Sequence, residues 1–412
     1  MKHTTFKQLA PNTRREFLHL AAAPVSSLLL AVCDRAAAAE TSLPPVPPSA
    51  SPAATGTLPL WVATLPLWQW HEIPNTALSS VDPAVRPLGN TGPRSKIDAW
   101  CGACLKRRGS VYMLGAAGGH SDYAGNEVDA LALNVTTPRW TQLRGPTSNA
   151  DIIGRAQFYL DRRPSATHTY YATQFIENLN RMLVFASGGA YGPFPPAPSD
   201  WPYVGSRRSF SFNVATGDWD PPDYVAQFTG IGDDINGALC VKHPVTNDVY
   251  YSRNYAPGWY KWESATNTWS MLSKTGRSPW YCGAAIDPLR NRMLIVGGYS
   301  ALPPEVRNLN GAKVAVAFAG LGATALALSG YPSVIYDETM DRYIVAFNSG
   351  NAIRILRVHP ETWHVDEPAM TRKAPTARTN GLQNAMQYVP ELRGFVVANR
   401  YDGNVYFVRT KA

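Results

Sequence analysis

The chain has 412 residues and a formal net charge of +8; 45% of its residues are hydrophobic and only 17% are charged. Glycine (32 residues), proline (34 residues) and aromatic residues (11%) are frequent. This composition is typical of short strands joined by turns, and it argues against a helical protein. The basic residues form no lysine-rich run, so we expect no nucleic-acid partner.

Residues 1–39 have the features of an export signal. The segment "TRREFL" (13–18) precedes an apolar run, and "AAAAE" would allow cleavage after Ala39. Paired arginines before Phe-Leu resemble the twin-arginine export signal. That resemblance implies the twin-arginine export machinery as a partner and a periplasmic or secreted location. An ordinary secretion signal or a membrane anchor is the alternative. Cys33, which ends "LAVC", would allow lipoprotein anchoring.

Residues 40–57 are rich in proline and serine and are interpreted as a linker. Residues 58–412 are expected to form one domain. Loss of residues 1–39 removes five basic and two acidic residues and leaves a net charge of about +5. This mild excess fits an anionic partner without requiring one. The apolar run 314–330 is interrupted by glycines and is interpreted as strands, so no transmembrane segment is expected after signal removal.

Three elements recur along this domain. One is a turn with Pro, Asn or Asp, followed by a strand and then Gly or Asn, as in 178–189 and 288–300. Another is a strand, a tight turn and a tryptophan, as in 261–272. The third is a small-residue strand before each turn, such as "AWCGACL". Together they predict a four-stranded blade. The blades are expected to start near Lys96, Thr167, Asp234, Ser278, Tyr331 and Gly381.

The last blade has no tryptophan strand before Ala412, and the segment near Trp70 would supply it from the other terminus. Such closure removes a free sheet edge. The sequence therefore predicts an all-β fold, a β-propeller of six or seven four-stranded blades closed by an N-terminal strand. The repeats resemble the Kelch-type, galactose-oxidase-like β-propellers. These include bacterial exported Kelch-like proteins and, more distantly, the propeller ulvan lyases.

One polar motif occurs in a single blade. In "GGHSDYAGNEV" (118–128) the paired glycines recur in other blades, but the polar residues after them do not. A requirement of the fold alone should recur with the fold, so these residues are candidates for a site wall. They are His120, Asp122, Tyr123, Asn126 and Glu127. The alternative is a hydrogen-bonded loop in which Asp122 and Asn126 cap turn amides and Glu127 pairs with an arginine.

Loops after equivalent strands emerge on one face of a propeller, so the counterparts of this loop should line the same mouth. The residues concerned are Tyr191, Arg253, Asn254, Tyr255, Tyr299, Asn399, Arg400 and Tyr401. Arg207 follows a long insertion that would fold over the mouth. His168 starts a central strand, where a polar residue that serves packing is the alternative.

The resemblance to ulvan lyases implies a His/Tyr/Arg set that acts on uronate-containing polysaccharide. His120, Tyr191 and Arg207 are its positional matches. The arginine would neutralise the carboxylate, while the histidine and tyrosine would transfer protons. The expected ligand is therefore an anionic carbohydrate. A non-catalytic propeller that binds a ligand or protein in the periplasm is the alternative.

No cofactor or metal is expected. The "CGAC" pair (Cys101 and Cys104) has no second pair to complete a zinc site, and packing in a crowded strand explains its small residues. No two histidines lie where a galactose-oxidase-like copper site would need them. A long-range disulfide among Cys101, Cys104, Cys240 and Cys282 is the alternative in an oxidising compartment.

Overall fold

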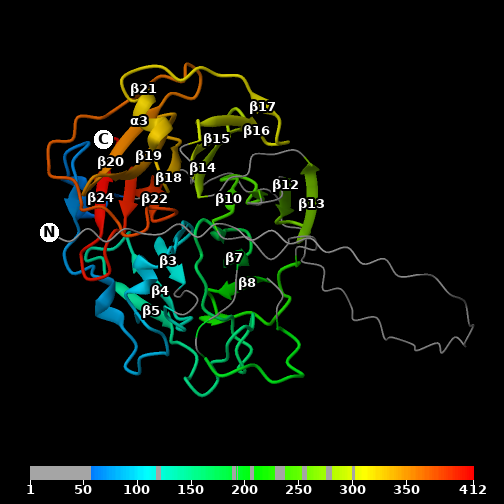
Figure 1. Cartoon of the computed structure of the whole chain (residues 1–412). Helices are drawn as coiled ribbons and strands as arrows, with labels where there is room; N and C mark the ends of the chain where they lie inside the picture. The colour runs from blue at the N-terminus through cyan, green and yellow to red at the C-terminus, as the bar shows by residue number, and fades with distance from the viewer. Residues whose placement is uncertain are drawn as a thin grey trace, which may run out of the picture. The chain divides into compact units, whose positions relative to one another are not determined.

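The computed structural model describes residues 57–116, 122–187, 192, 194–204, 208–227, 237–252, 258–274, 281–298 and 302–412. These residues form six four-stranded antiparallel sheets arranged as a β-propeller (Figure 1). The predicted all-β fold is confirmed, and the described part of the chain contains six blades. None of its helices has the length and apolarity that a membrane crossing would require.

Each of the first five blades consists of four consecutive strands. Blade 1 contains β2 (Cys104–Lys106), β3 (Tyr112–Ala116), β4 (Val128–Ala132) and β5 (Trp140–Arg144). Blade 2 contains β6 (Thr173–Ile176), β7 (Arg181–Ser187), β8 (Arg208–Asn213) and β9 (Asp218–Trp219). Blade 3 contains β10 (Leu239–Lys242), β11 (Val249–Ser252), β12 (Trp259–Glu263) and β13 (Thr268–Ser273).

The remaining elements complete the ring. Blade 4 contains β14 (Cys282–Asp287), β15 (Arg292–Gly297), β16 (Glu305–Asn308) and β17 (Lys313–Val314). Blade 5 contains β18 (Ser333–Asp337), β19 (Arg342–Ser349), β20 (Ala352–Val358) and β21 (Val365–Asp366). The helical segments are short: α1 (Leu60–Ala63), η1 (Leu78–Val81), α2 (Ser95–Asp98), α3 (Ala323–Leu328) and η2 (Pro390–Leu392).

Blade 6 joins both ends of the described chain. It contains β22 (Met386–Val389), β23 (Gly394–Val397), β24 (Tyr406–Arg409) and β1 (His71–Glu72). In the β1–β24 pair, His71 lies opposite Phe407 and Glu72 opposite Tyr406, and Figure 1 shows the blue N-terminal segment beside the red β24. The predicted closure by a strand next to Trp70 is confirmed. Closure gives β24 a partner and removes an unpaired edge.

The first strand of each blade lies on the propeller axis, beside the first strands of its two neighbours. Because every sheet is an antiparallel meander, the two ends of the axis differ. One end, the turn face, carries the turns between first and second strands and between third and fourth. The other end, the loop face, carries the second-to-third loops and the connections between blades.

The predicted tryptophan strands tie blades 2 and 3 to the blades that precede them. The Trp219 indole of blade 2 donates to the Asn126 carbonyl of blade 1 (3.1 Å). In the same way, Trp269 of blade 3 donates to the Ala226 carbonyl, in the connection that leaves blade 2 (2.9 Å). Each such bond contributes about 1 kcal/mol, because the partly buried indole N–H would otherwise lose its partner.

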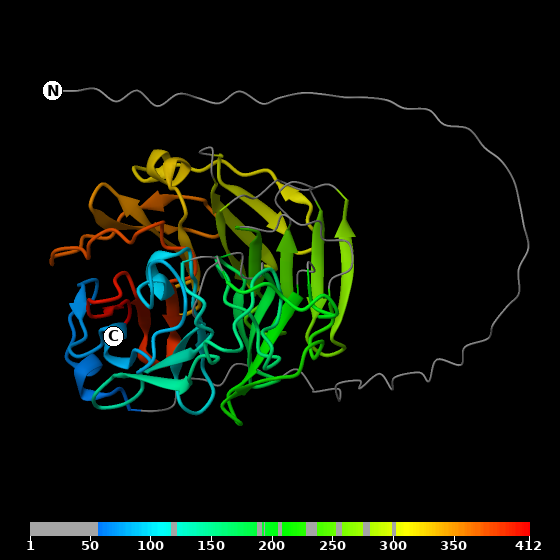
Figure 2. The ribbon, with the colours of Figure 1, turned by 60° about the horizontal axis from the view of Figure 1, so that its bottom comes forward.

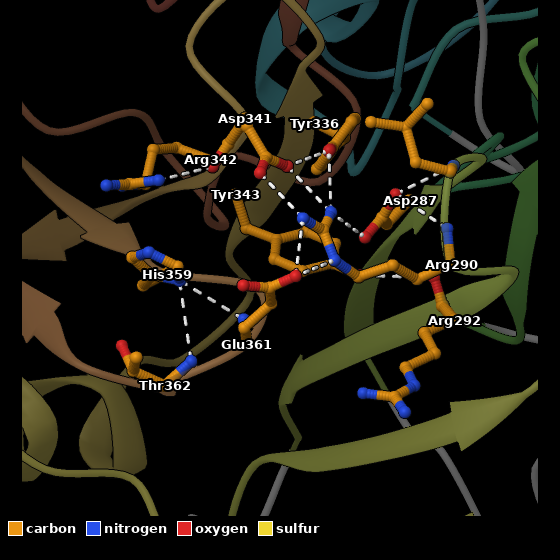
Figure 3. Close-up of polar contacts among 11 residues, drawn as sticks. Asp287, Arg290, Arg292, Tyr336, Asp341, Arg342, Tyr343, His359, Glu361 and Thr362 are labelled. Atoms are coloured by element: carbon orange, nitrogen blue, oxygen red, sulfur yellow. Dashed lines mark hydrogen bonds and ion pairs between the residues drawn. The ribbon is translucent and has the colours of Figure 1, made fainter.

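Charged turns join blades 4 and 5 on the turn face (Figure 3). The Arg290 guanidinium contacts Asp287 at 2.8 Å, Asp341 at 2.7 Å and Glu361 at 3.1 Å. Asp341 also accepts a hydrogen bond from the Tyr336 hydroxyl. Hydrogen bonds from Arg290 lower the pKa of Asp341, and this outweighs the opposite effect of burial. A single arginine thus links a turn of one blade with two turns of the next.

The interpretation of residues 314–330 as strands is wrong for most of that run. Strand β17 pairs with β16 through only two residues, and the alanine-rich stretch Ala323–Leu328 forms helix α3 at the edge of the ring (Figure 2). Alanine and leucine favour helix, and Leu326 gives the helix one fully buried anchor. Helix propensity therefore prevails where the sheet offers no further strand to pair with.

Ring closure should dominate the stability of the protein. Ile73 follows β1, is 1% exposed, and its amide bonds to the Val405 carbonyl at 2.9 Å. We expect Ile73→Ala to lower the free energy of unfolding by about 2–5 kcal/mol, since it leaves a cavity beside the closing strand. Leu60, 75% exposed, is the matched control; Leu60→Ala should stay within about 0.5 kcal/mol of wild type. Urea unfolding measures both, and equal effects would contradict this prediction.

Candidate functional site

Half of the sequence-predicted site residues fall where the structure gives no description. His120, Tyr191, Arg207, Arg253, Asn254, Tyr255 and Tyr299 lie outside the described residues. The others are Asp122, Tyr123, Asn126, Glu127, His168, Arg400 and Tyr401. These described residues occupy four separate environments, so the single-blade motif does not act as one unit.

Tyr123 and Glu127 belong to a buried charge cluster. The Lys96 ammonium lies 2.8 Å from Asp129 and 3.3 Å from Glu127, and all three side chains are 3% exposed or less. The Tyr123 hydroxyl donates to Glu127 at 2.7 Å. Glu127 therefore pairs with a lysine, and the expected arginine pairing is wrong. This placement favours a structural role, because no face of these groups is left for a ligand.

The cluster holds more negative than positive charge. Burial raises the pKa of Asp129 to about 7, and Lys96 offsets this only in part because it also serves Glu127. Burial alone would lower the pKa of Lys96, but the carboxylates of Asp129 and Glu127 outweigh it and raise that pKa. One lysine thus serves two buried carboxylates, and Asp129 takes up a proton as the pH falls through about 7.

Asn126 anchors a loop, as the structural alternative predicted. Its amide group donates to the Thr147 hydroxyl at 2.9 Å and to the Pro164 carbonyl at 2.7 Å. Its side-chain oxygen accepts from the Thr147 amide at 2.8 Å. All polar atoms of this buried side chain are bonded, so it fixes the connection from blade 1 to blade 2.

Asp122 has a different environment from the rest of the motif. Its carboxylate lies 3.0 Å from Nε2 of His168, and it is 32% exposed while His168 is 5% exposed. Nδ1 of His168 lies 3.4 Å from the Tyr170 hydroxyl. Because a carboxylate only accepts, the proton belongs on Nε2, and Nδ1 then accepts from Tyr170. The structure therefore aligns Asp122, His168 and Tyr170 in one hydrogen-bonded chain.

His168 and Tyr170 continue into an arc of rings at the loop-face end of the axis. The ring centroids are 5.0 Å apart for Trp100–His168 and 5.7 Å for His168–Tyr170. They are 5.6 Å apart for Tyr170–Tyr281 and 4.8 Å for Tyr281–Tyr331. We call these five residues the aromatic arc. Trp100, Tyr281 and Tyr331 keep part of their surface exposed.

The arc rests on an unusual backbone conformation. Trp100, Tyr170, Tyr281 and Tyr331 have φ between 46° and 55°, a left-handed region that bulky residues rarely adopt. Each is followed by the residues that lead into the first strand of its blade. Each such residue costs about 1–3 kcal/mol in backbone strain. The conformation therefore persists only where the surrounding structure imposes it. The equivalent residue of blade 3 is Gly237. It leaves space for the Tyr281 ring, because a Cβ at this position would lie 2.3 Å from that ring.

A buried arginine fills the gap between the two ends of the arc. The Arg378 guanidinium donates to the carbonyls of Cys101 and Gly381, at 2.5 Å and 2.7 Å, which lie next to the arc in space. Arg378 is 2% exposed, and within the described residues no carboxylate pairs with it. Its Nε has no hydrogen-bond partner there. Burial lowers the pKa of Arg378 to about 10, so it stays positively charged at neutral pH.

Tyr171 closes the axis below the arc. Its hydroxyl lies 3.0 Å from the Pro332 carbonyl and 3.2 Å from the Tyr281 carbonyl, so the side chain reaches across from blade 2 to blades 4 and 5. Burial raises its pKa well above the usual value, which keeps the hydroxyl protonated and donating. The loop-face end is therefore separated from the rest of the axis.

Arg400 and Tyr401 lie elsewhere, at a hollow of about 240 Å³ between blades 6 and 1. Arg400 pairs with Asp402 at 2.9 Å, and both side chains are more than half exposed. The Tyr401 hydroxyl bonds to Asp82. Asn399 is buried and donates to the Thr376 carbonyl at 2.8 Å. These residues thus border the hollow and do not join the arc.

Sequence reasoning missed Trp100, Tyr170, Tyr281, Tyr331 and Arg378. A signal for the aromatic residues existed: each directly precedes a small-residue strand, as in "WCGA" and "YCGA". Arg378 gave no signal, because one of the carbonyls that it bonds belongs to Cys101, which is 277 positions away in the sequence.

The described cysteines and the acidic groups suggest no metal centre. Cys101, Cys104, Cys240 and Cys282 are all buried and form no disulfide with one another in this structure, so the disulfide alternative is wrong here. Burial raises the pKa of the Cys101 thiol to about 11. Among the described residues, no group of three His, Cys, Asp or Glu side chains is placed to hold a metal ion.

Comparison with known proteins supplies no family. No sequence model of a protein family matches the chain, and no curated protein is similar to it. Among solved structures, a structural-genomics protein of unknown function from Bacteroides thetaiotaomicron has 9% sequence identity and a TM-score of 0.46. The match covers 82% of this chain and 75% of that chain. Membership of the Kelch-type family therefore stays a prediction.

The buried charge cluster should make stability depend on pH. The pKa of Asp129 is about 7 in the folded chain and about 3.9 in an unfolded one. Its contribution to stability is thus fully present below about pH 4 and is lost as the pH rises through about 7. We expect the unfolding free energy of wild type to fall, relative to Asp129→Asn, by up to about 1.4 kcal/mol per pH unit in that window.

Urea unfolding of both proteins between pH 5 and 8 measures this difference. Asp402→Asn, at an exposed carboxylate, is the matched control. Parallel profiles for wild type and Asp129→Asn would contradict the assignment of the extra proton to the cluster.

Proposed function

We propose that this propeller binds an acidic carbohydrate over the aromatic arc. The observation that carries the proposal is the arc itself, with an uncompensated guanidinium beside it. The faces of Trp100, Tyr281 and Tyr331 suit the apolar faces of sugar rings. Arg378 adds a positive potential that is little screened, because the side chain is buried among backbone carbonyls.

Features of the sequence support the same ligand class. The predicted domain carries a mild basic excess, and in the sequence Arg207 and Arg253 fall between the second and third strands of their blades. Together with Tyr191, Tyr255 and Tyr299, they would extend the surface on which an anionic chain rests. The twin-arginine pattern would place this binding in the periplasm or outside the cell, where such polysaccharides occur. The repeats fit a Kelch-type propeller, which leaves the chemistry to the loops.

A second candidate is elimination on a uronate-containing polysaccharide. The Asp122–His168–Tyr170 chain favours it, because a carboxylate that orients an imidazole raises the ability of the imidazole to accept a proton. A base removes the C5 proton of the uronate, and the electron pair is first held by the carboxylate in an enolate-like intermediate. That pair forms the C4=C5 double bond as the C4–O bond breaks, and an acid protonates the leaving oxygen. His120 remains the sequence-based candidate for one of these proton transfers.

Binding should depend on the arc. We expect Trp100→Ala to weaken binding of a polyuronate by about tenfold to a hundredfold, since it removes the largest stacking surface. Isothermal titration calorimetry with a polyuronate and a neutral glucan measures this. Leu321→Ala, at a fully exposed leucine away from the axis, is the matched control. Equal affinity for the two polymers, or full affinity in Trp100→Ala, would exclude the arc as an anionic carbohydrate site.

Catalysis should depend on the hydrogen-bonded chain. If the protein is a lyase, the near-ultraviolet absorbance of the unsaturated uronate should rise with wild type. We expect His168→Ala and Tyr170→Phe to lower that rate by about 10²–10⁴-fold while polymer binding persists. Asp122→Asn should also slow the reaction, because it removes the carboxylate that orients His168. Binding by wild type without any product would identify a non-catalytic binding module.

A further inference from the structure

A second cavity lies on the propeller axis, on the other side of Tyr171. It has a volume of about 170 Å³ and is lined by the first strands of all blades. It reaches the turn face, where Arg108 and Val245 border it, and Asn384 lies at its inner end, bonded to the Tyr171 carbonyl. We call this cavity the axial tunnel. No residue of the aromatic arc lines it.

Oxygen atoms of three side-chain amides line the inner part of the tunnel. The Gln174 amide group donates to the carbonyls of Tyr171 (3.1 Å) and Cys240 (3.2 Å). The Gln387 amide group donates to the carbonyls of Ala103 (2.9 Å) and Asn384 (2.8 Å).

These bonds fix which end of each amide is the oxygen, since a backbone carbonyl can only accept. Asn384 follows the same pattern through its bond to the Tyr171 carbonyl (2.8 Å). Among the described residues, no hydrogen bond reaches the amide oxygens of Asn384 or Gln387, and the Gln174 side chain also interacts with the Cys240 thiol. The inner tunnel therefore offers acceptors to a ligand that carries hydroxyl or amino hydrogens.

A lysine without an ion-pair partner stands further out. The Lys242 ammonium donates one hydrogen bond, to the Phe175 carbonyl at 2.6 Å. Within the described chain no carboxylate lies within salt-bridge distance of it. The carboxylate of nearby Glu177 is already bonded to the backbone amides of Arg107 (2.6 Å) and Arg108 (3.3 Å). Two of the three ammonium hydrogens of Lys242 are thus left for a ligand.

The charges around Lys242 support this placement. Burial lowers the pKa of Lys242 to about 8; Glu177 and the Cys104 thiol oppose the shift, and Arg107 and Arg108 add to it. A carboxylate at this position would restore the missing counter-charge. Arg107 is itself held by Glu391 (3.1 Å) and Glu338 (3.2 Å), so it does not compete for that ligand.

The wall beside blade 5 is rigid. Tyr336 lines the tunnel, and its hydroxyl bonds to Asp341, which Arg290 holds in a bidentate pair (Figure 3). Its ring therefore presents a fixed surface to the tunnel. A preformed wall lowers the ordering cost of binding a small ligand.

We propose that the axial tunnel is a second binding site, and that it takes a small carboxylate that also carries hydroxyl groups. The carboxylate would bond to Lys242, and the hydroxyl groups would donate to the oxygens of Gln174, Asn384 and Gln387. A simple carboxylate leaves the amide oxygens without donors, and a neutral polyol leaves Lys242 without a counter-charge. The site does not depend on the function proposed for the aromatic arc.

Calorimetry on the full chain with three probes tests this inference. Gluconate has both groups, acetate has only the carboxylate, and sorbitol has only the hydroxyls. We expect gluconate to bind at least tenfold more tightly than acetate or sorbitol. Lys242→Met should weaken gluconate binding at least tenfold, and Gln174→Met should weaken it by a smaller factor. Trp100→Ala, which alters only the arc, should bind gluconate as wild type does.

Wild type gives an independent measurement in case Lys242→Met does not fold. Its affinity for gluconate should fall as the pH rises from 7 to 9.5, because Lys242 loses its charge in that range. Equal affinity for the three probes, an affinity that stays constant with pH, or unchanged binding by folded Lys242→Met would each overturn the proposal. Loss of binding in Trp100→Ala would assign gluconate to the arc and would also overturn it.

Discussion

Crowding at the axis is the constraint on which the rest of this structure depends. Six first strands meet there, and their backbones approach so closely that a Cβ on Gly102 would lie 2.1 Å from the Tyr170 carbonyl. Small residues such as Cys104, Cys240 and Ala284 relieve the crowding. A residue with positive φ precedes each first strand, and in four of the six blades this residue carries a large ring. The left-handed conformation turns that ring away from the packed strands and toward the loop face.

Crowding also leaves backbone carbonyls of the first strands without strand partners at the axis, and polar side chains satisfy them. Gln174, Asn384 and Gln387 bond to such carbonyls on the turn-face side, while Arg378 does so on the loop-face side. A buried carbonyl without a donor costs about 1–3 kcal/mol, so these side chains have a structural reason to be present. Each of these four side chains also has polar atoms that do not bond to the backbone. A ligand at the axis would bond to those atoms.

The fold was largely predictable from the sequence, because its signals are local and repeated. Alternating strands, turn residues and the spaced tryptophans gave six blades and the closure next to Trp70. The strand interpretation of residues 314–330 is wrong because an apolar run without a clear period is compatible with both a buried strand and a short helix. The site was less predictable. Arg378, for instance, bonds to the distant Cys101 carbonyl as well as to the nearby Gly381, and no local pattern marks such a position.

The single-blade motif shows why uniqueness within a repeat does not by itself indicate a site. The residues after Gly119 occur once, and a fold requirement was expected to recur in every blade. Ring closure, however, also happens only once: segment 73–99 runs from blade 6 to blade 1, packs against both, and brings Lys96 to the motif. Tyr123 and Glu127 are unique because Lys96 is unique. Among the described residues of the motif, Asp122 remains the functional candidate. The closing segment holds it through Thr91 (3.4 Å), but its carboxylate also reaches His168 of the aromatic arc.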